Sequence, residues 1–231
     1  MYEYCENNPL NKSDYLGLWD IKRNGEAWAI ATAEEGDTFD SLAVEVQLDT
    51  SDYKIWAHTQ HEQPKPKCDY EIPNTIYYHH DEFTFWRPLL LDLWRSQNRK
   101  DAKNHERNGF KVVWIEKNVL SGAIKAALSD EYLYQYFYTG HGVGGGSVND
   151  GHIIANRYTK HGINLLRINS CGSADKTSGA GEKKYYERNM WEWNVATRGW
   201  FVGYEGNINV LTEALGWRIV RGNNRNGPIL K

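Results

Sequence analysis

The sequence predicts an α/β fold, a mainly parallel sheet flanked by helices, preceded by a small α+β module. Two observations predict it. Short apolar runs alternate with segments of helical character after about residue 70, which is typical of a parallel sheet with helical crossovers. A shorter pattern of strand, turn and helix precedes them in the sequence, and a stretch rich in proline and lysine separates the two. A chain of 231 residues can form both units.

The composition excludes several classes of protein. Its 27 basic and 30 acidic residues give a net charge of -3 without a long run of either sign, so we expect no nucleic-acid partner. No apolar run reaches 18 residues and the first residues lack a signal-peptide pattern, which predicts a soluble chain without membrane insertion. The 3 cysteines include no Cys-x-x-Cys pair, so we expect no structural zinc and at least one free thiol.

Residues 25–58 are expected to form the small module. A short apolar strand leads to the turn Gly36-Asp37-Thr38 and then to a helix with apolar periodicity, which Asp37 or Thr38 can cap. The run from Gly36 to Leu42-Ala43 resembles a lysin motif, and the resemblance implies binding to N-acetylglucosamine chains such as those of peptidoglycan. A capped helix that serves packing alone is the alternative. Residues 59–69, with two prolines, are expected to form a linker.

Residues 1–18 are rich in turn-forming residues and are followed by the module. The run Tyr2-Glu3-Tyr4-Cys5-Glu6-Asn7-Asn8-Pro9-Leu10-Asn11, with Asp14 and Gly17-Leu18 after it, resembles the end of the core of Rhs-repeat proteins. It departs from the family at Tyr15, where proline is usual. The resemblance implies that the rest of the chain is a variable C-terminal effector domain, associated with an Rhs shell and delivered outside the cell. An ordinary N-terminal extension of a cytoplasmic protein is the alternative.

Residues 70–231 are expected to form the α/β domain. The expected strands lie at residues 69–78, 111–115, 132–138, 163–168 and 199–204, and the expected helices at residues 89–107 and 122–128. In such sheets the active site lies beyond the carboxyl ends of the strands. Here His141 follows one strand within Gly140-His141-Gly142, and Cys171 follows the next, so neighbouring strands would bring a base to a thiol.

This order of residues resembles the caspase-hemoglobinase fold, in which a strand ending in His-Gly precedes a strand ending in the nucleophilic cysteine. The resemblance covers about residues 110–210 and implies a cysteine endopeptidase. In it His141 handles the proton, Cys171 is the nucleophile, and the backbone N–H groups of Gly142 and Cys171 form the oxyanion hole. Gly172-Ser173 stand where caspases have Arg-Gly, so specificity for aspartate does not carry over.

Other interpretations of these residues stay open. Cys171 can be a buried structural thiol and His141 a structural histidine. The glycine-rich residues 142–147 lack the Gly-Lys-Ser/Thr of a phosphate loop, which favours a flexible active-site loop. Asp150, His152 and Asp175 can shape the site or lie in solvent.

Two further groups of residues are poor candidates for a metal site or a catalytic pair. The adjacent residues His79-His80-Asp81-Glu82 make a poor metal chelate, because neighbouring side chains point in different directions. A papain-like pair of Cys68 with His141 lacks a helix to lower the pKa of the thiol.

The sequence therefore predicts a cysteine peptidase that acts on protein or peptide substrates without a metal or cofactor. Two alternatives remain: a peptidoglycan-binding protein whose α/β domain is inactive, and a transferase that uses the same thiol.

Overall fold

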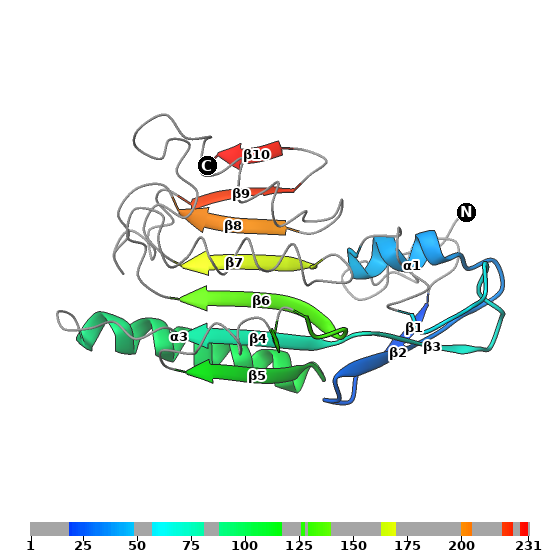
Figure 1. The fold of residues 1–231 in the computed structure, drawn as a ribbon, viewed down its shortest axis with the longest axis horizontal. Coiled ribbons are helices and arrows are strands. Elements are labelled where there is room, and N and C mark those ends of the chain that lie inside the picture. Colours follow the sequence, from blue (N-terminus) through cyan, green and yellow to red (C-terminus); the bar gives the residue numbers. More distant parts are fainter. Residues whose placement is uncertain are drawn as a thin grey trace, which may run out of the picture.

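The computed structural model describes residues 19–48, 57–80, 88–116, 126–127, 129–139, 163–169, 200–204, 219–223 and 227–230. Within these residues, ten strands form two sheets, one of three strands and one of seven (Figure 1). The small sheet lies beside the end of the large sheet at which the parallel strands begin (Figure 1). The opposite edge, to which the arrowheads point, is where these strands end.

The small sheet is antiparallel and carries one helix. Its order is β1 (Asp20–Lys22), β2 (Trp28–Thr32) and β3 (Asp69–Pro73), and α1 (Phe39–Val46) lies between β2 and β3 in the sequence. The helix buries side chains at the spacing i, i+3, i+4 and i+7, which is one face of an α-helix. These side chains are Phe39, Leu42, Ala43 and Val46. The apolar periodicity seen in the sequence is therefore the packing face of α1.

The start of α1 is fixed by a capping box. The hydroxyl of Thr38 accepts a hydrogen bond from the backbone N–H of Ser41 at 3.0 Å, and the Ser41 hydroxyl oxygen accepts from the N–H of Thr38 at 3.1 Å. The indole of Trp19 also donates to Ser41 Oγ at 3.0 Å. Thr38, rather than Asp37, is thus the cap, since it satisfies donors that the first turn leaves unpaired.

The large sheet has the order β10-β9-β8-β7-β6-β4-β5. Its parallel strands are β4 (Thr75–His80), β5 (Lys111–Glu116), β6 (Leu133–Thr139), β7 (Leu165–Asn169) and β8 (Trp200–Tyr204). Two antiparallel strands complete one edge, β9 (Ile219–Asn223) and β10 (Gly227–Leu230). The helix α3 (Pro88–Arg107) connects β4 to β5 and packs against both (Figure 1).

The predicted α/β class with a mainly parallel sheet is confirmed. The expected strand over residues 69–78 is instead two strands, because the chain passes from the small sheet to the large one at Asn74. The strands β1, β9 and β10 were not predicted. Residues 1–18 and most of the expected helix at 122–128 lie outside the described residues.

Asn74 joins the two sheets through a side chain that is fully buried. Its amide oxygen accepts from Arg23 Nη1 at 2.7 Å, and its amide nitrogen donates to the carbonyls of Glu26 at 3.0 Å and Gly109 at 2.9 Å. Gly109 has a φ of +79°, and a β-carbon there would lie 2.5 Å from the Arg23 carbonyl oxygen. The close approach of these backbones therefore requires glycine.

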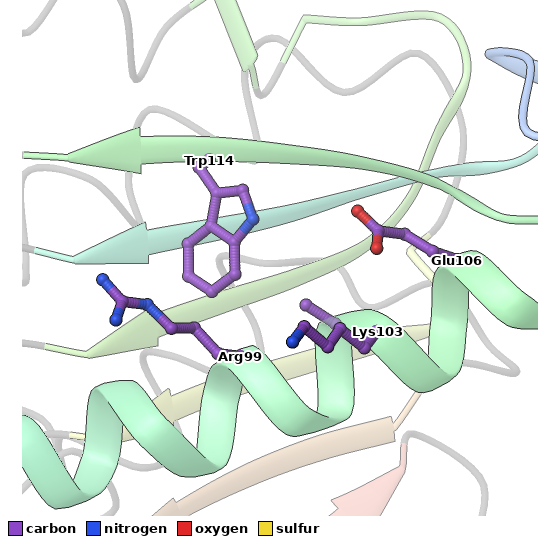
Figure 2. Close-up of a pocket in the computed structure, with 5 residues that line it drawn as sticks. Arg99, Lys103, Glu106 and Trp114 are labelled. Atoms are coloured by element: carbon purple, nitrogen blue, oxygen red, sulfur yellow. The ribbon is translucent and has the colours of Figure 1, made fainter.

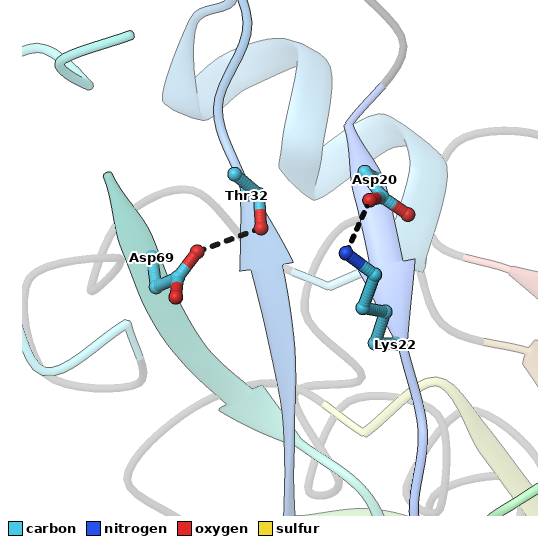
Figure 3. Close-up of polar contacts among 4 residues, drawn as sticks. All are labelled: Asp20, Lys22, Thr32 and Asp69. Atoms are coloured by element: carbon cyan, nitrogen blue, oxygen red, sulfur yellow. Dashed lines mark hydrogen bonds and ion pairs between the residues drawn. The ribbon is translucent and has the colours of Figure 1, made fainter. Parts of the chain in front are cut away.

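The outward face of the small sheet carries polar side chains (Figure 3). Thr32 Oγ1 donates to Asp69 Oδ1 at 2.7 Å between paired positions of β2 and β3. On β1, Lys22 Nζ lies 2.7 Å from Asp20 Oδ2. Both ends of this ion pair are well exposed, so it contributes little to stability. The polar residues mark the solvent side of the sheet.

We expect Asn74→Ala to lower the free energy of unfolding by about 3 kcal/mol, because it leaves buried groups of Arg23 and Glu26 without a partner. Urea unfolding measures the change. Asn24→Ala is the control, since the Asn24 side chain makes one exposed hydrogen bond, to Glu26 N. It should cost less than about 1 kcal/mol, and equal losses in the two variants would contradict the role of Asn74.

Candidate functional site

The two strands that precede His141 and Cys171 are neighbours. β6 and β7 pair in parallel (Figure 1). Thr139 at the end of β6 is the register partner of Asn169 at the end of β7. His141 and Cys171 each follow their strand end by two positions. His141, Gly142 and Cys171 lie outside the described residues, so the structure describes the strands that lead to the site and not the site residues themselves.

A row of polar side chains lies at these strand ends. His80, Thr139 and Asn169 are register partners across β4, β6 and β7, and Asn98 reaches the row from α3. All four are buried, with exposed fractions of 5% or less. Paired residues of neighbouring strands share a face of a sheet, so the row faces α3. We call these four residues the strand-end network.

The network is held by hydrogen bonds that use both hydrogens of one amide. Asn98 Nδ2 lies 2.8 Å from His80 Nε2 and donates to Thr139 Oγ1 at 3.0 Å. Thr139 Oγ1 also accepts from Asn169 Nδ2 at 3.4 Å, and Asn169 Oδ1 accepts from Arg167 Nε at 3.0 Å. The ends of three strands are thus joined to the middle of α3 near the predicted site.

The contact with Asn98 makes His80 a neutral imidazole. Because an amide nitrogen can only donate, His80 Nε2 is the acceptor and the ring proton is on Nδ1. Burial, with smaller contributions from Arg95, His79 and Arg99, lowers the pKa of His80 to about 4. His80 therefore stays uncharged at neutral pH, and no positive charge at the strand ends comes from this ring.

The neighbouring His79 faces the other side of the sheet. Its Nδ1 lies 2.8 Å from the hydroxyl of Tyr136, and its ring packs edge-on against Tyr138 at 5.0 Å between centroids. His79 and His80 thus have separate partners on opposite faces, as expected for adjacent residues of a strand. No group of three or more His, Cys, Asp or Glu side chains within the described ranges is placed to hold a metal ion.

Cys68 belongs to the small sheet. It is partly buried, its backbone carbonyl accepts from Ala33 N at 3.0 Å, and it directly precedes β3. It therefore lies at the side of the molecule where the parallel strands begin. The chain around residues 142–147, Asp150, His152 and Asp175 lies outside the described residues.

A hollow of about 210 Å³ lies between α3 and β5 (Figure 2). Its lining residues are Arg99, Ala102, Lys103, Glu106 and Trp114. Trp114 stands on β5, which β4 separates from β6, so the hollow is distinct from the ends of β6 and β7. The hollow is adjacent to the strand-end network, because the ring of Trp114 packs edge-on against His80 at 5.2 Å between centroids.

A second group of side chains gathers beside the small sheet. Tyr132 lies between two rings, with centroid distances of 5.4 Å to Trp28 and 5.3 Å to the exposed His58. Its hydroxyl donates to Glu71 Oε2 at 3.1 Å. Burial and this carboxylate raise the pKa of Tyr132 to about 12, so the phenol stays neutral. Partly exposed rings beside a carboxylate can contact a ligand that has both apolar faces and hydroxyl groups.

Sequence reasoning missed the strand-end network. It treated His80 only as part of a poor metal chelate, and it did not single out Asn98. One signal was available: His80, Thr139 and Asn169 are polar residues at the ends of strands rich in aromatic or aliphatic residues. Buried polar groups require partners, so polar residues at such positions predict a shared hydrogen-bond network.

Comparison of the chain with known protein families found no match, and no curated protein matched it significantly. None of the helices in the described part of the chain has the length and apolar character needed to cross a membrane.

We expect His80 to make folding stability dependent on pH. The pKa of His80 is lowered in the folded protein, so its contribution is complete above pH 6.5 and is lost as pH falls through about 4. The loss should be on the order of 2–3 kcal/mol. Urea unfolding between pH 7 and 4 measures it, and His80→Gln, which keeps an acceptor for Asn98, should flatten the curve.

The exposed His61 provides the control for this measurement. His61→Gln should retain the wild-type dependence on pH. Burial also lowers the pKa of His105, so a smaller slope remains in His80→Gln. An unchanged slope in His80→Gln would show that His80 takes up its proton as readily in the folded as in the unfolded chain.

Proposed function

We propose that the α/β domain is a caspase-like cysteine endopeptidase in which His141 and Cys171 form the catalytic dyad. The observation that supports it most is the parallel pairing of β6 with β7, with Thr139 level with Asn169. Neighbouring strands lie about 4.8 Å apart, so the two chain segments that carry the dyad start side by side. A thiol and an imidazole need such proximity to exchange a proton.

The strand order supports the same site. When the parallel strands are numbered along the chain, with β4 first, β5 second and β6 third, their order across the sheet is 2-1-3-4-5. The order reverses between β4 and β6, and ligands of open α/β sheets bind outside the carboxyl ends at such a point. The chain reaches His141 directly after β6. A substrate bound at this edge would therefore lie beside the proposed base.

The proposed reaction proceeds in two steps. His141 takes the proton of Cys171, the Sγ atom attacks the substrate carbonyl carbon, and the N–H groups of Gly142 and Cys171 stabilise the oxyanion. The carbon–nitrogen bond breaks as His141 protonates the leaving amine. Water then attacks the thioester with His141 as base, releasing the carboxylic acid and restoring the thiol. Asn or Gln at position 141 would remove the base and leave the thiol.

The likeness of residues 1–18 to the end of an Rhs core extends the proposal. The chain would then be the effector part of a larger protein, and its substrates would be proteins or peptides met after delivery. The residue preferred before the scissile bond is a question for substrate profiling, because caspase specificity does not carry over to Gly172-Ser173.

Alkylation of the native protein with iodoacetamide between pH 5 and 9 tests the dyad. We expect Cys171 to react faster than Cys5 and Cys68 and to keep its reactivity below pH 7, because a nearby imidazolium stabilises the thiolate. His141→Ala should lower the rate of alkylation of Cys171 below pH 7 by about tenfold or more. Mass spectrometry locates the labelled thiols.

Peptide cleavage provides the second measurement. Cys171→Ala should abolish cleavage of a peptide library while far-UV circular dichroism and the melting temperature stay near wild type. A Cys171 that reacts no faster than Cys68, or that is indifferent to His141, would refute the peptidase proposal.

The second candidate function is glycan binding by the small module. The group formed by Trp28, Tyr132, His58 and Glu71 favours it, because sugars bind to aromatic faces flanked by hydrogen-bonding side chains. Co-sedimentation with insoluble peptidoglycan tests it. We expect Trp28→Ala to weaken binding by about tenfold, whereas Val44→Ala, at an exposed position of α1, should bind like wild type. Equal binding by all three proteins would refute it.

A further inference from the structure

We propose that Asn98 is a positioning residue for the dyad. Its side-chain amide fixes the ends of β4, β6 and β7, and these strand ends hold His141 and Cys171 in place. This inference rests on the proposed function, since it concerns the segments that carry His141 and Cys171. The residues that carry it all lie within the described ranges. They are the four members of the strand-end network.

The position of the network in the sheet is the first argument. Thr139 and Asn169 are the last residues of their strands, and each precedes a dyad residue by two positions. A shift of either strand end would therefore move the imidazole or the thiol. An error of about 1 Å in the placement of reacting groups can reduce a rate by two orders of magnitude.

The sharing of atoms is the second argument. Thr139 Oγ1 accepts from both Asn98 Nδ2 and Asn169 Nδ2, so the ends of β6 and β7 meet at one oxygen atom. The other hydrogen of the Asn98 amide binds His80 Nε2 on β4. Asn98 thus contacts two strands directly and the third through Thr139. Loss of this amide would break the hydrogen bonds that join the ends of β4 and β6 to α3.

The choice of polar side chains is the third argument. In the row before the network, Tyr78 of β4 is stacked between Trp114 of β5 and Phe137 of β6 at centroid distances of 4.9 and 4.7 Å. Such packing would hold these three strands together without a buried amide, a hydroxyl and an imidazole. Apolar contacts tolerate sliding, whereas hydrogen bonds fix direction and length. Between β4 and β6 the side chains thus meet through stacked rings in this row and through hydrogen bonds in the last row before the proposed site.

Asn98→Ala in the full chain is the central variant, and Asn164→Ala is its matched control. Asn164 is also a buried asparagine: its amide donates to Val46 O at 3.1 Å and accepts from Gln135 Nε2 at 2.6 Å. It lies where β7 begins, at the opposite edge of the sheet. Both variants lose buried hydrogen bonds, so their melting temperatures should fall by similar amounts.

The readout is the rate of alkylation of Cys171 by iodoacetamide as a function of pH. We expect Asn98→Ala to raise the apparent pKa of the thiol and to slow alkylation at pH 6 by about tenfold. Asn164→Ala should keep the wild-type profile within about twofold. Hydrogen exchange adds a measurement that needs no activity: residues 140–145 and 170–175 should exchange faster in Asn98→Ala than in Asn164→Ala.

A second pair of variants covers the case in which Asn98→Ala does not fold. Thr139→Val removes the shared oxygen but keeps the shape of the side chain, and it should alter the profile as Asn98→Ala does. Thr139→Ser keeps the oxygen and should retain the wild-type profile. If Thr139→Val also keeps the wild-type profile, the proposal is overturned.

The outcomes separate this inference from the proposed function. If wild-type Cys171 depends on His141 but Asn98→Ala matches Asn164→Ala, the dyad stands and the positioning role is overturned. If wild-type Cys171 is indifferent to His141, the peptidase proposal fails and the positioning role falls with it. If the dyad is present and only the variants at the strand-end network change the alkylation profile of Cys171, Asn98 acts on the placement of the dyad and not on global stability.

Discussion

The buried Asn74 sets the register on which the large sheet depends. Its backbone N–H lies between the carbonyls of Ala27 at 3.0 Å and Tyr132 at 3.1 Å, and its own carbonyl accepts from Lys111 N at 3.1 Å. One residue therefore determines where β4, β5 and β6 begin relative to one another. A register shift in β6 follows, since Thr75 pairs with Leu133 and Ile76 with Gln135, which adds one residue to β6 before the strands run on in step. The alignment of His80 with Thr139 at the other end therefore depends on Asn74 together with this shift.

The sequence predicted those elements whose pattern is local. Apolar runs located β5, β6, β7 and β8 to within two residues at each end, and apolar periodicity located α3 and α1. The break at Asn74 was missed because residues 69–78 alternate continuously, although Pro73-Asn74 is a turn signal that could have shown it. The strands β9 and β10 contain Gly222 and Pro228, which weaken a strand pattern, so the pairing of β9 with β8 and of β10 with β9 determines them. For the site, the order of residues suggested which strand ends to compare. That β6 and β7 are neighbours is a property of the whole sheet.

The two ends of the parallel strands in the large sheet have different roles in this arrangement. The small sheet and α1 meet the end of the large sheet where the strands begin, through Asn74 and through Asn164, which binds the last carbonyl of α1. A strand of six or seven residues spans about 20 Å, so the small module lies a strand length away from the ends of β6 and β7. The module therefore stabilises the register of the sheet without contributing side chains to a site at the opposite edge. Glycan binding there and catalysis at the other edge would be compatible in one chain.

The neutral state of His80 has a consequence for the proposed chemistry. An imidazolium at the end of β4 would attract a thiolate nearby and would compete with His141 for control of its proton. The amide of Asn98 and the burial of the ring keep His80 uncharged down to about pH 4, so it supplies position and no charge. If Cys171 is the nucleophile, His80 would add no charge beside its thiolate, whereas the guanidinium of Arg167, which donates to Asn169 Oδ1, is a charged group at the same end of the strands. A change in thiol reactivity caused by His141→Ala would then not be masked by titration of His80.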